Sequence, residues 1–348
     1  MSQQTPYWFY NENAPPGLPD CDDVVSKIDF NSPRGGFAYP SEVSPVCWVK
    51  YGCTVYWNEV LSQNMANVGL AAIRSDVRAP AVYFAFQCES TTIIVMEYIE
   101  GRTVEDAWAG ADDTERAKIV DGVARALRAL IQIPIGASRV PSAIDGSRIR
   151  HRMFSDQIAP RHYENVEQLQ EHINLFLQRS TPRKSSALQC SNLSDEPMLY
   201  CFSDVHPANF MIDINGGIVV IDFAETSFLP ASFVLCRIHG NRLDFDVTQL
   251  VTIPGASANN VCALGTAGRW ITLGPSSFAS MGRRVKGGDD TTQQRLESCI
   301  QTGGRKRPHR MADVEGIGEG WDMMCVKDFW SLTSKAMRSR RLEGRMVY

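Results

Sequence analysis

Residues 201–223 read Cys-Phe-Ser-Asp-Val-His-Pro-Ala-Asn-Phe-Met-Ile-Asp-Ile-Asn-Gly-Gly-Ile-Val-Val-Ile-Asp-Phe, and this stretch decides how the chain is interpreted. Asp204 begins a short loop that Asn209 ends. Two apolar runs follow with an Asn-Gly-Gly turn at residues 215–217 between them, and the second run leads to Asp222. Asn-Gly between two β-rich runs is a strong signal for a β-hairpin. The open ends of a hairpin meet, so the stretch predicts that Asn209 and Asp222 are neighbours beside Asp204.

These three polar residues suit the transfer of a phosphoryl group. The side-chain oxygens of Asn209 and Asp222 are the kind of ligand that Mg²⁺ prefers, and a bound Mg²⁺ clamps the phosphates of a nucleotide. The carboxylate of Asp204 is then placed to accept the proton of a substrate hydroxyl. The pattern therefore indicates a kinase. The alternative is an ordinary hairpin with polar surface residues, because Asp and Asn are common in turns for local reasons.

A second pair of charged residues lies upstream. Residues 46–51, Val-Cys-Trp-Val-Lys-Tyr, predict a short strand that contains Lys50, and a lysine is rarely buried in a strand without a partner. Residues 58–68 have apolar side chains at near-helical spacing, which predicts a helix with Glu59 at its start. In kinases a strand lysine holds the nucleotide phosphates and a helix glutamate holds that lysine. The alternative is an edge-strand lysine and an exposed helix acid.

The stretch around Asp204 resembles the aminoglycoside phosphotransferase family. The family pattern is His-Gly-Asp, two residues, Pro, one residue, Asn, and then a hairpin that ends in Ile-Asp. The matching residues are Asp204, Pro207, Asn209 and Asp222. The family's His is replaced by Phe202 and its Gly by Ser203. In kinase-like folds that His packs behind the loop, and we expect Phe202 to fill the same space without the polar contacts. Residues 48–52, Trp-Val-Lys-Tyr-Gly, also look like a run that is common in fungal members of the family.

The resemblance covers residues 40–285 and implies a two-lobed protein-kinase-like fold of the α+β class. The small N-lobe is β-rich and the larger C-lobe is helical. We expect four segments: an irregular N-terminal segment over residues 1–25, a nucleotide-binding N-lobe over 26–100, a catalytic and substrate-binding C-lobe over 101–284, and a poorly ordered basic tail over 285–348. Residues 103–131 carry apolar side chains at three- and four-residue steps and predict a long helical region.

The resemblance also implies a site for the adenine base. Two apolar runs, residues 80–86 and 92–98, predict a second hairpin that ends at Glu97 and Tyr98. These two residues correspond to the family's hinge, where adenine forms hydrogen bonds with the main chain. The alternative is a plain strand that leads into a linker.

Three acidic residues follow the proposed metal ligand Asp222, namely Glu225, Asp244 and Asp246. Carboxylates near the acceptor site would attract a cationic group, so they suggest a hydroxylated substrate that carries an amine. The alternative is that these acids are scattered surface charges.

The composition of the 348 residues is typical of a globular protein, with 44% hydrophobic and 21% charged residues. No apolar run approaches the roughly 20 residues of a membrane span, and no signal peptide is recognisable, so we expect a cytoplasmic protein without a membrane partner. The ten cysteines form no Cys-x-x-Cys pair, which favours buried free thiols over disulfides or a metal site. Residues 283–348 carry a net charge of +5 and residues 1–282 a net charge of −9. We interpret the basic end as a solvated extension rather than a nucleic-acid site.

The function predicted from the sequence is an ATP- and Mg²⁺-dependent phosphotransferase that acts on a hydroxyl of a small-molecule metabolite. Two other readings stay open. One is a protein kinase, against which stand the absence of a His-Arg-Asp loop and the Ala224 that follows Asp222-Phe223. The other is a catalytically weak kinase fold used as a binding module. The sequence does not identify the acceptor or the oligomeric state.

Overall fold

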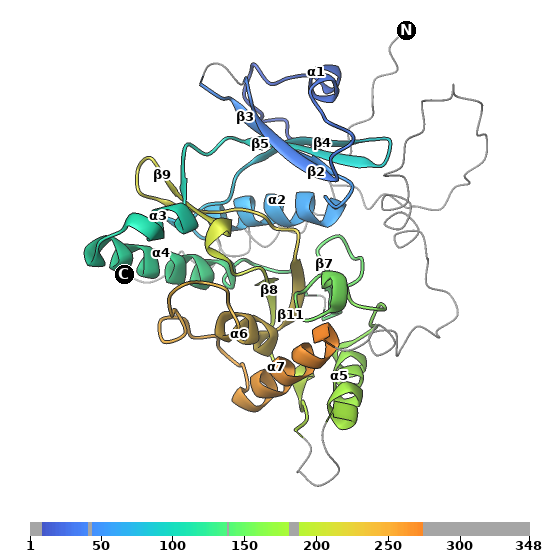
Figure 1. Ribbon diagram of the computed structural model, residues 1–348. Helices are drawn as coiled ribbons and strands as arrows, with labels where there is room; N and C mark the ends of the chain where they lie inside the picture. Colours follow the sequence, from blue (N-terminus) through green and yellow to red (C-terminus); the bar gives the residue numbers. More distant parts are fainter. Residues whose placement is uncertain (1–8, 41–43, 138, 181–187, 274–348) are drawn as a thin grey trace, which may run out of the picture. The chain divides into compact units, whose positions relative to one another are not determined.

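The computed structural model of the protein describes residues 9–40, 44–137, 139–180 and 188–273 (Figure 1). All of them lie in one unit that spans Met1–Gly303. The basic tail expected over residues 285–348 lies outside the described residues.

A five-stranded antiparallel sheet forms the N-terminal part. Its strands are β1 (Phe9–Tyr10), β2 (Arg34–Tyr39), β3 (Cys47–Gly52), β4 (Val82–Cys88) and β5 (Thr91–Glu97). The spatial order is β1-β4-β5-β3-β2, so β3 lies between two partners and is not an edge strand. Both the strand predicted around Lys50 and the hairpin predicted over residues 80–98 are confirmed.

Helices cover both faces of this sheet. The short helix α1 (Cys21–Ser26) packs its Val24 with Val49 and Phe86 in one apolar cluster. The longer helix α2 (Trp57–Ala72) contacts β4 and lies along the other face (Figure 1). It begins one residue before the helix predicted over residues 58–68 and continues through Gly69 to Ala72. A sheet with two covered faces explains why its central strands are apolar almost throughout.

The region that follows the sheet is helical, as predicted, but is divided into two helices. They are α3 (Val104–Gly110) and α4 (Asp113–Leu130). Ala111 between them is extended, with a ψ of 137°. Asp112 then accepts a hydrogen bond from the main-chain N–H of Glu115 at 2.8 Å and caps α4. The Asp-Asp-x-Glu sequence supplies a strong N-cap in the middle of the apolar pattern, which favours a new helix start over continuation.

Two small sheets carry the stretch that opened the sequence analysis. In the first, β9 (Phe210–Asp213) pairs with β10 (Ile218–Val220) and with β6 (Gly101–Thr103). The predicted hairpin is confirmed, and Gly216 at its turn has a φ of 81°, which favours glycine. In the second sheet, β11 (Thr226–Pro230) lies between β7 (Ser142–Ala143) and β8 (Met198–Phe202).

Three further helices complete the larger part: α5 (Val166–Ser180), α6 (Ala231–His239) and α7 (Ala258–Leu273). Helix α7 contacts both α5 and α6. Their apolar side chains join those of α4 and β8 in the largest cluster of buried residues. Three single-turn 3₁₀ helices occur in the connections, namely η1 (Ser155–Gln157), η2 (Leu193–Asp195) and η3 (Pro207–Asn209). A small β-rich lobe and a larger helical lobe are thus present, and the expected α+β class is confirmed.

The described residues contain no helix long and apolar enough to cross a membrane. Eight cysteines lie in the described part of the chain. Four of them are buried: Cys21, Cys47, Cys190 and Cys201.

Candidate active site

Lys50 lies in the middle of β3, and the alternation of the strand decides where its side chain points. Val49 and Tyr51 pack in the cluster with α1, so Lys50 points to the opposite face. Its Nζ lies 2.5 Å from Oε1 of Glu59 on α2 and 3.1 Å from Oδ1 of Asp222. The strand β3, the helix α2 and the end of the β9–β10 hairpin therefore meet at one cation.

Burial acts on each member of this ion-pair group. It works to lower the pKa of Lys50, but the attraction of Glu59 and Asp222 outweighs it and the pKa is raised. Burial raises the pKa of Glu59, and Lys50 offsets only part of this effect. Burial also works to raise the pKa of Asp222, but the positive charges of Lys50 and Arg34 outweigh it and the pKa is lowered. Lys50 and Asp222 therefore stay charged near neutral pH.

The loop between β8 and β9 brings Asn209 to Asp204. Nδ2 of Asn209 donates to the main-chain oxygen of Asp204 at 3.0 Å, which leaves the amide oxygen for another partner. The main-chain N–H of Ile221 donates to the main-chain oxygen of Asn209 at 2.9 Å, so the next residue, Asp222, lies beside this loop. The structure thus assembles the three polar residues at the open end of the hairpin.

The backbone of Asp222 is in an uncommon conformation. Its φ is 60°, in the left-handed region that non-glycine residues rarely adopt. Strained backbone of this kind is found at functional sites more often than elsewhere, where the surrounding structure holds it in place. The strain at Asp222 is therefore consistent with a selected position for its carboxylate.

Phe202, which replaces the family's His, is buried behind the loop. It is 4% exposed, and its ring lies 5.4 Å from that of Phe223 and 6.1 Å from that of Phe210, edge to face in both cases. These centroid distances are typical of favourable aromatic pairs. Phe202 thus supports the loop by packing on the residues that flank it.

Arg152, which the sequence analysis did not single out, lies between two acidic residues. Its Nη2 donates to Oδ2 of Asp204 at 2.8 Å, and its Nε forms an ion pair with Oε2 of Glu225 at 2.8 Å. Arg152 belongs to a loop without apolar periodicity, where Arg148, Arg150 and Arg152 alternate with apolar or aromatic residues. That alternation was the only local signal for this residue.

The carboxylate of Glu225 is mostly shielded from water, with the side chain 11% exposed, so its charge is costly. Burial raises its pKa to about 7, although Arg152 opposes the shift, and repulsion from Asp204 and Asp222 adds to it. The ion pair and the raised pKa are compatible, because the loss of hydration exceeds the attraction of one guanidinium. Glu225 therefore exchanges a proton near neutral pH.

Asp244 and Asp246, the other two acids predicted to face the substrate, lie in the loop after α6. Both are exposed, and Oδ1 of Asp246 accepts a hydrogen bond from the main-chain N–H of Thr248 at 2.8 Å. This loop contacts the loop between β8 and β9, because the main-chain N–H of Arg242 donates to the main-chain oxygen of Val205 at 3.0 Å. Among the contacts of the described residues, neither aspartate meets Asp204 or Glu225.

Glu97 and Tyr98, predicted at the hinge, stand at the end of β5. The carboxylate of Glu97 lies 2.5 Å from Nη1 of Arg78 and accepts the N–H of Ala81 at 3.1 Å. The main-chain N–H of Ile214 donates to the main-chain oxygen of Glu100 at 3.1 Å and connects this segment to the β9–β10 hairpin. The side chain of Glu97 therefore has structural partners, and its main-chain N–H donates to the main-chain oxygen of Ala81 at 2.8 Å.

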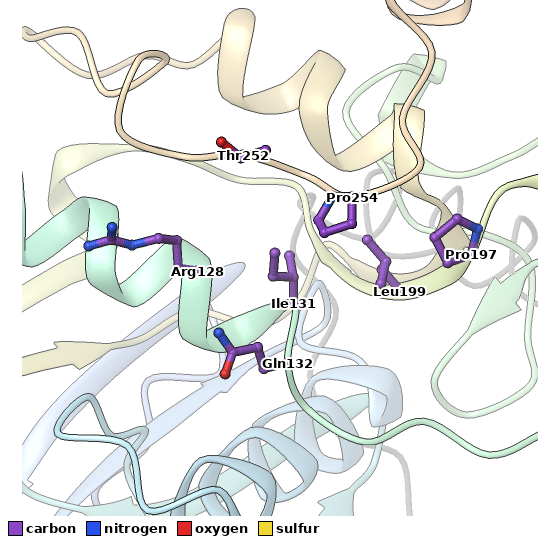
Figure 2. Close-up of a pocket in the computed structure, with 7 residues that line it drawn as sticks. All are labelled: Arg128, Ile131, Gln132, Pro197, Leu199, Thr252 and Pro254. Carbon is purple, nitrogen blue, oxygen red and sulfur yellow. The ribbon is translucent and has the colours of Figure 1, made fainter.

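One hollow of about 310 Å³ on the surface lies outside this site (Figure 2). It is lined by Arg128, Ile131, Gln132, Pro197, Leu199, Thr252 and Pro254. None of the predicted site residues is among them.

Some solved structures are similar to this chain at low sequence identity. One is a thermostable mutant of aminoglycoside phosphotransferase APH(4)-Ia in a ternary complex with ADP and hygromycin B, with 14% identity, a TM-score of 0.44, and coverage of 80% of this chain and 94% of that chain. Another is choline kinase LicA from Streptococcus pneumoniae, with 13% identity, a TM-score of 0.33, and coverage of 73% of this chain and 85% of that chain. At such low values the family assignment depends on the sequence match.

The model of the phosphotransferase enzyme family, APH, matches residues 63–233. The matched part contains Asp204, Asn209 and Asp222, and it begins after Lys50 and Glu59. No curated protein sequence matches the chain. Residues 63–233, which include the β9–β10 hairpin, thus match the phosphotransferase enzyme family.

Proposed function

We propose that the protein transfers the γ-phosphoryl group of ATP to a hydroxyl of a small-molecule metabolite. The observation that carries the proposal is the junction of Lys50 with both Glu59 and Asp222, next to the loop that holds Asp204 and Asn209. A paired lysine, a metal-binding carboxylate and a separate base are the parts that phosphoryl transfer requires.

In this proposal the nucleotide binds between the two lobes, residues 26–100 and 101–284. Lys50 contacts the phosphates, and Glu59 holds the lysine in place. The adenine base of ATP forms hydrogen bonds with the main chain at Glu97 and Tyr98. Arg34 adds a second positive charge near Asp222.

The residues present fit a Mg²⁺ ion. Asn209 has an amide oxygen left for a ligand, and Asp222 has one carboxylate oxygen beyond the one that meets Lys50. The described residues contain no group of three His, Cys, Asp or Glu side chains that would hold a metal alone. Mg²⁺ usually takes one or two protein ligands and completes its shell with phosphates and water. When bound, it would neutralise charge on the phosphates.

Asp204 would receive the proton that the acceptor loses. The acceptor oxygen forms a bond to the γ-phosphorus, the bond between this phosphorus and the bridging oxygen of ADP breaks, and ADP leaves with that bond pair. The proton moves from the acceptor hydroxyl to the carboxylate of Asp204, whose buried Oδ1 has no hydrogen-bond partner among the described residues. The products are ADP and a phosphorylated metabolite.

Calorimetry with a non-hydrolysable ATP analogue, with and without Mg²⁺, tests the proposal. We expect Mg²⁺-dependent binding, which Asp222→Ala abolishes. Asp204→Asn is the matched comparison: it should bind the nucleotide nearly as well as the natural protein, while turnover falls by roughly 10²–10⁴. Absence of binding under both conditions would refute a kinase.

A further inference from the structure

Asp204 and Glu225 are neighbours because two paired strands end and begin beside them. Strands β8 and β11 are antiparallel, and Phe202 is the register partner of Thr226. Asp204 follows β8 by two residues, and Glu225 directly precedes β11. The main-chain N–H of Ser203 donates to the main-chain oxygen of Glu225 at 3.0 Å and extends the strand pairing by one residue. The topology thus places two carboxylates at one end of this sheet.

The guanidinium of Arg152 bridges these two carboxylates. Two different nitrogens are used, Nη2 for Asp204 and Nε for Glu225, each at 2.8 Å. The contact with Glu225 is an ion pair without hydrogen-bond alignment. The side chains of Arg152, Asp204 and Glu225 are 23%, 15% and 11% exposed, so water screens the three charges only partly. Nε of Arg237 donates to the oxygen of Ser203 at 2.9 Å and adds a second positive charge nearby.

We propose that Arg152 is a positioning residue for phosphoryl transfer, which fixes the carboxylate of Asp204 through its Oδ2, while Glu225 anchors the guanidinium. The inference rests on the proposed function. A carboxylate held at one oxygen loses the freedom to rotate about its Cβ–Cγ bond. The planar guanidinium of an arginine carries several nitrogens and can contact two carboxylates at once, whereas a lysine presents a single point charge.

A purely structural role explains the arrangement less well. The segment that carries Arg152 is already fixed by contacts of its main chain: the N–H of Arg150 donates to Oγ of Ser227 at 2.8 Å, and the N–H of Arg152 donates to Oγ of Ser203 at 3.3 Å. Oγ of Ser227 donates in turn to the oxygen of Arg150 at 3.0 Å. The guanidinium is therefore not required to fix the segment and is available to orient Asp204.

The experiment measures ADP release from ATP and Mg²⁺ by the full chain, with water as the acceptor. We compare Arg152→Met, Arg152→Lys and Arg152→Ala, the last with and without guanidinium ion. In Arg152→Met we expect kcat to fall roughly 10²-fold, the scale that a misplaced reacting group costs, with a nearly unchanged KM for ATP. Arg152→Lys should lose less, and guanidinium should restore part of kcat to Arg152→Ala. The control is Arg128→Met, at a position on α4 whose arginine side chain is 43% exposed. Its kcat should equal that of the natural protein.

Two further variants separate positioning from folding. Glu225→Gln removes the anchor and should lower kcat less than Arg152→Met does. The double variant should be no slower than Arg152→Met alone, because both changes act on the same carboxylate. The inference is overturned if Arg152→Met keeps kcat within about threefold of the natural protein, or if neither lysine nor guanidinium restores turnover. Failure of the natural protein to bind the ATP analogue with or without Mg²⁺ overturns the proposed function itself, which is a different result.

Discussion

Replacement of Glu225 by Gln should remove a pH dependence from the stability of the protein. The folded-state pKa of Glu225 is about 7, against an ordinary value of 4.5, because its side chain is buried and faces Asp204 and Asp222 as well as Arg152 and Arg237. A raised carboxyl pKa contributes stability that is fully present below pH 4.5 and lost as pH rises through 7. Linkage gives a loss of roughly 2–3 kcal/mol between about pH 5 and about pH 8.5.

The assay is chemical denaturation of the natural protein and of Glu225→Gln at both pH values. Every other titrating group is shared by the two proteins, so the difference between their free energies of unfolding isolates Glu225. From the lower to the higher pH, this difference should change by roughly 2–3 kcal/mol in favour of the variant. Glu171→Gln, at an exposed position on α5, should show no such change. A difference for Glu225→Gln that stays constant within about 0.5 kcal/mol would refute the reasoning, because burial would then not dominate at this carboxylate.

Two further substitutions test the packing and the charges of the site. Phe202→Ala opens a cavity among Phe210 and Phe223 and should lower the free energy of unfolding by roughly 3–5 kcal/mol, whereas Phe202→Leu should cost much less; equal denaturation midpoints for the two variants would contradict this packing. Lys50→Met leaves the carboxylates of Glu59 and Asp222 without their cation and should destabilise the protein by roughly 3–5 kcal/mol. The double change Lys50→Met with Glu59→Gln should recover part of that loss in the same assay, and an additive result would show that the two residues are not coupled.

Local signals in the sequence were enough to predict the hairpin and the strand of Lys50. The Asn-Gly turn fixes the hairpin register within a few residues, and Phe210 indeed faces Val220. The pairing of Lys50 with Glu59 is also nearly local, because helix α2 directly follows strand β3 in the sequence. The contact of Lys50 with Asp222 spans 172 positions and was not predicted, because the sequence analysis gave these residues separate roles, phosphate binding and metal binding.

Arg152 escaped prediction for a physical reason. It lies in a loop, and loops have no periodicity that assigns a side chain to a face. Its two partners, Asp204 and Glu225, lie beside the ends of β8 and β11, which pair only in the folded chain. Helix and strand patterns predict which residues are buried together, but an isolated polar contact of this kind depends on the three-dimensional course of a single connection.

The charge around Glu225 also shows why a sequence count does not give a local potential. Residues 1–282 carry a net charge of −9, and this value suggested an acceptor site that attracts cations. Near Asp204, however, Glu225 is paired with Arg152 and Arg237 lies close by, so the acids and bases in contact there nearly cancel. Of the three acids proposed to attract a cationic acceptor, Asp244 and Asp246 are exposed and lie outside this balanced group. Exposed charges are screened by salt over about 8–10 Å, whereas buried ones are screened much less. Attraction by these two aspartates would consequently weaken with ionic strength, while the balance at Asp204 would not.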